Sequence, residues 1–245
     1  MTSRADSANS VMLIEEYAAR LANSHVSKQL HALFLIKHEI YSILQKTKDP
    51  AMAVIRLKWW YEEVAKSRNN GFATLNMEFE IIQNYLKEVS EENLLDIANW
   101  IASYEPMVSR GYLTDLLEDY IVPVSDTYQK VLKEIYHCNI SSKLALMISI
   151  NDFLDYMPFF FKFGWYWAQD EADFNNQLKL VWERFDVVSK RENGITIDKK
   201  VKFLYQAHEC LISKYRKYEK WELSCLPKLN LGLMRMSLAF IALNK

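Results

Sequence analysis

Glycine and proline are scarce in this chain, with five of each among 245 residues. A β-rich protein of this length needs many more turn residues, because tight turns rely on glycine and proline for their backbone angles. The scarcity therefore argues against a sheet-based fold and favours long helices joined by few turns.

Neither sign of charge is in excess, since 30 basic residues stand against 31 acidic ones and the net charge is −1. A nucleic-acid-binding domain carries a basic surface, so we expect no nucleic-acid partner. Cysteine is scarce as well: Cys138, Cys210 and Cys225 have no CxxC spacing, which predicts free thiols in a reducing compartment. No apolar signal segment follows the N-terminus, and the predicted location is the cytoplasm.

Long hydrophobic runs are also missing. A membrane-spanning helix needs about 20 apolar residues, whereas the aromatic run MPFFFKFGWYW covers only residues 157–167 and contains a proline, a lysine and a glycine. Packing inside the protein is one interpretation of this run. The other is contact with a membrane surface, where aromatic rings favour the headgroup level. The candidates for that contact are Phe159, Phe160, Phe161, Trp165 and Trp167.

What the chain does contain is a helical spacing of apolar residues along nearly its whole length. Asp49-Pro50 is a strong helix start, because aspartate caps free amides and proline fits the first helical position. We predict one all-α domain over residues 11–245, preceded by a disordered N-terminus at 1–10. The predicted helices cover 11–23, 27–46, 50–68, 75–88, a segment opening at Ser90, 110–120, 125–138, 140–156, 170–190, 197–220 and 223–243.

The helix after Asp49 contains the run RLKWW, in which Trp59 and Trp60 are adjacent. Helical neighbours point about 100° apart, so one face cannot bury both rings. Trp59 shares a side with Met52 and Ile55, which predicts that Trp59 is a core residue and that Trp60 packs under a neighbouring helix. Alternatively, one of the two rings lines a cavity.

Residues 32–64 resemble the N-terminal part of the squalene/phytoene synthase family. In that family a helix of the type ALYAFNxEL is followed by a proline and then by R-L-x-W-W. Here Ala32-Leu33-Phe34 and Glu39 match the first element, and Pro50, Arg56-Leu57 and Trp59-Trp60 match the second. The resemblance implies an isoprenoid-synthase fold, a bundle of helices around a central apolar cavity, with Glu39, Arg56, Trp59 and Trp60 at or near that cavity.

The resemblance also implies a chemistry. Active family members condense two prenyl diphosphates head to head, and Mg²⁺ held by two aspartate-rich motifs on facing helices neutralises the diphosphate. In the first motif this chain offers only Glu39, with Ile43 four residues on. In the second, Asn151 and Asp155 match, but a following acidic pair is replaced by Pro158-Phe159.

Asp152 and Asp155 are three residues apart, which makes them weak metal-ligand candidates; a solvated pair is the favoured interpretation. The metal-binding residues of the family are therefore largely missing, and no catalytic residue is identified. Mg²⁺ is expected only if the chain is catalytic.

The resemblance favours a non-catalytic assembly or interaction factor, as in a branch of the family that serves in the assembly of respiratory complex I. Such a protein would bind a membrane-protein subunit or an isoprenoid or other lipid, in the cytoplasm or peripherally at the inner face of a membrane. Two alternatives stay open: a prenyltransferase of the squalene/phytoene synthase type with relocated carboxylates, and a lipid-binding module.

Overall fold

The computed structural model describes residues 10–47, 49–67, 77–106, 115–162 and 171–217. Within these ranges every regular element is a helix, which confirms the all-α prediction. The elements are α1 (Ser10–Leu21), α2 (Ser24–Lys46), α3 (Pro50–Lys66), α4 (Met77–Glu88), α5 (Glu91–Ala102), the π-helix η2 (Leu117–Ile121), α7 (Val122–Tyr136), α8 (Ser142–Lys162), α9 (Glu171–Arg191), the 3-10 helix η3 (Lys199–Val201) and α10 (Lys202–Tyr215).

Local capping explains several helix starts. The side chain of Asp49 accepts a hydrogen bond from the amide of Ala51 at 2.9 Å, and Pro50 occupies the first turn of α3, as the sequence predicts. Ser90 caps α5 in the same way by accepting from the amide of Asn93. These caps satisfy amides that have no partner within the helix, and so they fix where α3 and α5 begin.

Other predicted boundaries differ from the structure. The predicted helix 125–138 begins earlier, because η2 runs directly into α7 at Val122. The predicted helix 140–156 continues to Lys162, and the predicted helix 197–220 begins with η3 and ends at Tyr215. The predicted N-terminal segment up to residue 9 and the predicted helix 223–243 lie outside the described residues.

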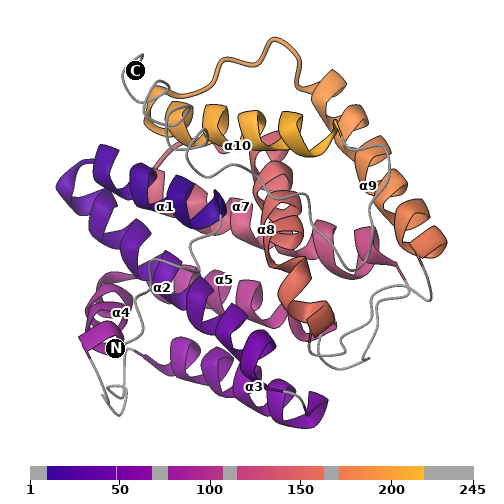
Figure 1. Cartoon of the computed structure of the whole chain (residues 1–245). Coiled ribbons are helices and arrows are strands. Elements are labelled where there is room, and N and C mark those ends of the chain that lie inside the picture. Colours follow the sequence, from indigo (N-terminus) through magenta and orange to yellow (C-terminus); the bar gives the residue numbers. More distant parts are fainter. Residues whose placement is uncertain (1–9, 48, 68–76, 107–114, 163–170, 218–245) are drawn as a thin grey trace.

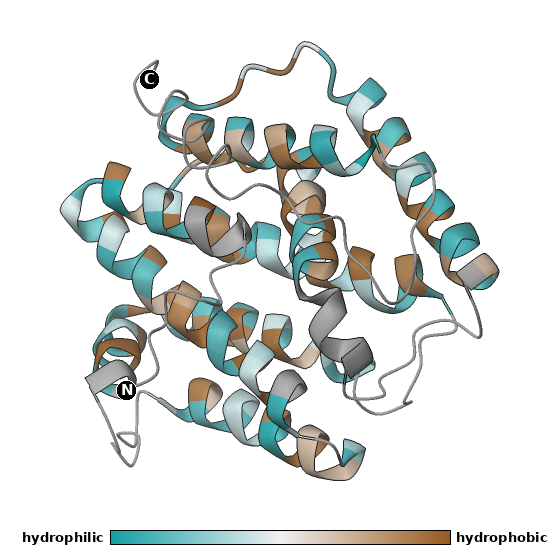
Figure 2. Ribbon diagram, viewed as in Figure 1, coloured by the Kyte–Doolittle hydropathy of each residue, from teal (hydrophilic) through white to brown (hydrophobic). Residues whose placement is uncertain are grey.

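Helix α8 runs through the middle of the bundle (Figure 1). It packs against α7, α9 and α10, and it also contacts α1 and α2. At the lower edge of the same view, α3 packs against α5, which in turn packs against α7. Hydrophilic and hydrophobic residues alternate along helices such as α9 and α10 (Figure 2), as in helices with one buried side.

The core is rich in aromatic side chains. Trp100 meets Tyr104 edge to face at 5.8 Å between ring centroids, and Tyr104 meets Tyr41 in the same way at 5.6 Å. Both geometries are favourable for aromatic pairs. Within the described ranges, none of the helices combines the length and the apolar character needed to cross a bilayer.

Candidate functional site

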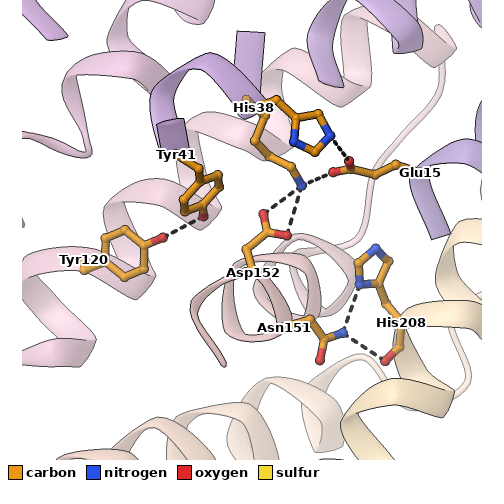
Figure 3. A network of polar contacts seen from close by, with 8 residues as sticks. Glu15, His38, Tyr41, Tyr120, Asn151, Asp152 and His208 are labelled. Atoms are coloured by element: carbon orange, nitrogen blue, oxygen red, sulfur yellow. Dashed lines mark hydrogen bonds and ion pairs between the residues drawn. The ribbon is translucent and has the colours of Figure 1, made fainter. Parts of the chain in front are cut away.

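A cluster of buried charged side chains lies between helices of the bundle (Figure 3). The ammonium of Lys37, on α2, donates to both carboxylate oxygens of Asp152, on α8, at 2.9 and 3.0 Å. The same ammonium forms an ion pair with Glu15, on α1. All three side chains are at least 96% buried. One cation therefore joins the consecutive helices α1 and α2 to α8, whose Asp152 is 115 positions from Lys37 in the sequence.

The position of Lys37 follows from the width of the buried face of α2. Leu33, Ile36 and Ile40 are fully buried, as the apolar spacing predicts, but Tyr41 on the neighbouring row is buried as well. At 100° per residue, Lys37 falls between these two rows and so points into the interior. Its ammonium lies over the rings of Phe34 and Tyr128 at 5.9 and 5.8 Å, which adds cation–π attraction to the two ion pairs.

The cluster contains two carboxylates and one ammonium, and its charges are therefore unequal. Burial raises the pKa of Asp152 to about 7, although Lys37 opposes this effect, and the nearby Glu15 carboxylate raises it further. Burial also acts to raise the pKa of Glu15, but Lys37 and His38 outweigh it and hold that pKa below its ordinary value. Near neutral pH, Asp152 is the carboxyl group of this cluster that takes up a proton.

Tyrosine hydroxyls surround one side of the cluster. Tyr41 and Tyr120 share a hydrogen bond between their hydroxyl oxygens at 3.0 Å (Figure 3), and the ring of Tyr104 lies edge-on to both. Burial raises the pKa of each of these phenols, and the Asp152 carboxylate raises it further. The three tyrosines therefore stay neutral and can donate or accept hydrogen bonds next to the ions.

On its other side α8 binds α10. The amide of Asn151 donates to the backbone carbonyl of His208 at 3.2 Å and contacts the ring nitrogen Nδ1 of the same residue at 2.9 Å. Burial, followed by the charge of Lys37, lowers the pKa of His208 to about 3, which keeps the ring neutral. The hydroxyl of Tyr215 donates to Asp155, one turn further along α8.

The prediction of a solvated aspartate pair on α8 is wrong. Asp152 is 2% exposed and Asp155 is 8% exposed, and each is bound by a side chain from another helix. Both lie in a helix whose surrounding residues are apolar, and the sequence alone does not show the distant partners that stabilise two carboxyl groups there.

The donor set of this cluster does not fit Mg²⁺. The resemblance places one carboxylate motif on α2 and the other on α8, but α2 presents the ammonium of Lys37 to Asp152. Glu39 is half-buried and lies about 200° around α2 from Lys37, on a different side of the helix. Among the residues that the structure describes, no group of three or more His, Cys, Asp or Glu side chains could hold a metal ion.

Comparison of the chain with models of protein families, with curated proteins and with solved structures found no match. The resemblance carried by residues 32–64 therefore stays a prediction, as does the central apolar cavity.

The second half of the family motif lies away from the ion cluster. Trp60 is buried, with 3% exposure, whereas 43% of Trp59 is exposed and its ring meets that of Trp60 edge to face at 5.2 Å. Arg56 is exposed and donates to the hydroxyl of Thr47 at 3.0 Å. The prediction that Trp59 is a core residue is wrong, because the face of α3 that carries it points away from the neighbouring α5.

The candidates for membrane contact lie partly outside the described residues. Phe159, Phe160 and Phe161 belong to the last turns of α8, but their side chains lie outside the described residues, as do Trp165 and Trp167 altogether. Contact of this segment with a membrane stays a prediction.

Glu15 and Lys37 are the residues of the cluster that sequence reasoning missed. A lysine inside an otherwise apolar row of a helix was the available signal, since burying an unpaired ammonium is very costly. Such a lysine requires a buried acidic partner, and Asp152 stands within the apolar run of residues 144–154. These two positions indicate that each needs a buried partner, but they do not show that Lys37 and Asp152 are partners of each other.

The pH dependence of stability offers a test of the cluster. Asp152 binds a proton more tightly in the folded state, so its contribution to the free energy of unfolding falls as pH rises from about 4 to about 7. His208 binds a proton more tightly in the unfolded state, so its contribution rises with pH between about 3 and about 6.5. The two effects oppose each other in the native chain.

We expect single variants to separate them. Relative to the native chain, the free energy of unfolding of Asp152→Asn should rise with pH, and that of His208→Gln should fall, each by about 1 kcal/mol per pH unit between pH 4.5 and 6. Urea unfolding followed by circular dichroism measures both slopes. Parallel pH profiles for the two variants would contradict this assignment of the protons.

Proposed function

We propose that this chain is a non-catalytic relative of the squalene/phytoene synthases that acts as an assembly or interaction factor, of the kind that serves respiratory complex I. The observation that carries the proposal is the bidentate ion pair between Lys37 and Asp152. It joins the two helices on which the resemblance places the metal-binding motifs, and the group that α2 contributes there is a cation.

The physical argument concerns charge. Head-to-head condensation needs Mg²⁺ to neutralise the diphosphate leaving group, and Mg²⁺ needs carboxylate oxygens at close range. Lys37 already occupies the carboxylates of Glu15 and Asp152, and its own positive charge repels a divalent cation. Losing a single preorganised charge contact at a transition state costs about 3–4 kcal/mol. Turnover by the family reaction is therefore not expected.

The enzymatic half of the proposal is tested by incubating the purified chain with farnesyl or geranylgeranyl diphosphate and Mg²⁺, beside an active squalene synthase as positive control. We expect no squalene- or phytoene-type hydrocarbon from this chain by gas chromatography and mass spectrometry. Formation of either product would overturn the non-catalytic assignment.

The assembly half needs a cellular test. In cells that lack the chain, we expect less assembled complex I on native gels, and the native sequence should restore it. Complex I at its normal level in those cells would overturn the assembly role and leave the result of the prenyl diphosphate test unaffected.

A further inference from the structure

The outer face of α3 is apolar although it points away from the core. Met52, Ile55 and Trp59 are spaced by three and four residues and therefore form one row along the helix. Their exposed fractions are 45%, 58% and 43%. The buried residues of the same helix, Ala53, Leu57, Trp60 and Val64, lie on the opposite side. We name the row of Met52, Ile55 and Trp59 the outer row of α3.

Charged residues border the outer row in an ordered way. Arg56 and Lys58 lie nearer the N-terminus of α3, and Glu62 and Glu63 lie nearer its C-terminus. At 100° per residue, Arg56 and Glu63 lie on one flank of the row, and Lys58 and Glu62 lie on the other. Each flank is thus basic toward the N-terminus of α3 and acidic toward its C-terminus.

We propose that two copies of this chain associate through α3, antiparallel and about a two-fold axis close to Trp59. In an antiparallel pair each flank faces the same flank of the other copy, running in the reverse direction. Arg56 then lies opposite Glu63 of the partner subunit, and Lys58 lies opposite Glu62 of the partner subunit. A parallel pair would instead place like charges opposite each other.

The apolar contacts agree with the same arrangement. Around an axis near residue 59, Trp59 packs against the symmetry-related tryptophan, and the aliphatic stem of Lys66 covers the partner's Met52. α3 lies at the lower edge of the bundle (Figure 1), where a second copy can approach. Because long cationic side chains bury their stems on apolar surfaces, Lys66 does not oppose the contact.

The contacts that these charged residues make within the chain do not prevent them from pairing with the second copy. Glu62 pairs with Lys66 at 3.2 Å, and Arg56 donates to Thr47 at 3.0 Å. Exposed pairs of this kind contribute little to stability. One helix face buries less than the roughly 800 Å² per partner of a standard interface, so we expect a dissociation constant on the order of micromolar.

Sedimentation equilibrium of the full chain from about 1 to 100 μM tests the proposal. Arg56→Glu and Glu63→Arg should each weaken the dimer at least about tenfold, because each creates two like-charge contacts across the axis. The double variant Arg56→Glu/Glu63→Arg should restore the native affinity. Val187→Glu is the matched control, because Val187 is 60% exposed on α9, and it should change nothing.

Three outcomes would overturn the proposal: a monomer at every concentration, single reversals that leave the dimer unchanged, or a double variant that stays as weak as the singles. Circular dichroism of each variant separates loss of the dimer from loss of the fold. Cosedimentation with phosphatidylglycerol vesicles tests whether the outer row of α3 binds a lipid surface instead of a second copy. A monomer that binds these vesicles and loses the binding in Trp59→Ser would assign the outer row to a lipid surface, also against the proposal.

Discussion

Replacing Lys37 by methionine is expected to lower the free energy of unfolding by about 3–5 kcal/mol. Methionine fills nearly the same volume, so the loss comes from charge and not from a cavity. Without the ammonium, Glu15 and Asp152 face each other in the interior with no cation between them. Asp152 must then be buried as an uncompensated charge or take up a proton, and among the described residues Glu15 keeps only its contact with His38 at 3.5 Å.

Urea unfolding at pH 7 measures the loss, and two comparisons make it specific. Lys28→Met changes an exposed lysine on the same helix, and its effect should stay within about 0.5 kcal/mol. Adding Asp152→Asn to Lys37→Met should recover part of the stability, since one of the two carboxylates that lost the ammonium is then removed. If Lys37→Met is no more damaging than Lys28→Met, the ammonium does not hold the cluster together.

A buried ion cluster is not an efficient way to stabilise a core, because desolvation cancels much of the attraction between the charges. We expect its effect here to be on the arrangement of the helices. Lys37 and Asp152 are 115 positions apart in the chain, and Glu15 brings in a third helix. Leucines at these positions could pack in several registers, whereas an ammonium that must satisfy two carboxylates fixes how α1, α2 and α8 lie relative to one another.

The local features of the fold could be predicted because they depend on neighbouring residues. Asp49-Pro50 determines where α3 begins, and the spacing of Leu33, Ile36 and Ile40 identifies a buried side of α2. The ion cluster could not be derived in this way. Whether Asp152 is solvated or buried depends on a lysine from another helix, and no local pattern shows which helices will be neighbours.

The adjacent tryptophans also show that a local sequence pattern does not determine which side of a helix meets the core. Helical periodicity correctly separates two apolar rows on α3, one with Met52, Ile55 and Trp59 and one with Leu57 and Trp60. It does not say which row meets the core. The prediction chose the row of Trp59, whereas the row with Leu57 and Trp60 is the buried one in the helix that packs against α5.

Truncating the two tryptophans in turn is expected to give very different results. Trp60→Ala should lower the free energy of unfolding by about 3–5 kcal/mol, because the ring is buried and its removal leaves a large cavity. Trp59→Ala should cost about 1 kcal/mol or less, because 43% of the side chain is exposed; the loss includes its edge-to-face contact with Trp60.

Both variants are best measured by urea unfolding at a protein concentration where the chain is monomeric, so that association through α3 does not add to the stability. The order of the two effects is the decisive result. Equal losses would mean that Trp59 is covered in the folded chain, and the outer row of α3 would then offer no surface to a second copy. A large loss for Trp60 alone agrees with Trp59 lying exposed at the centre of that row, where it is available to a second copy.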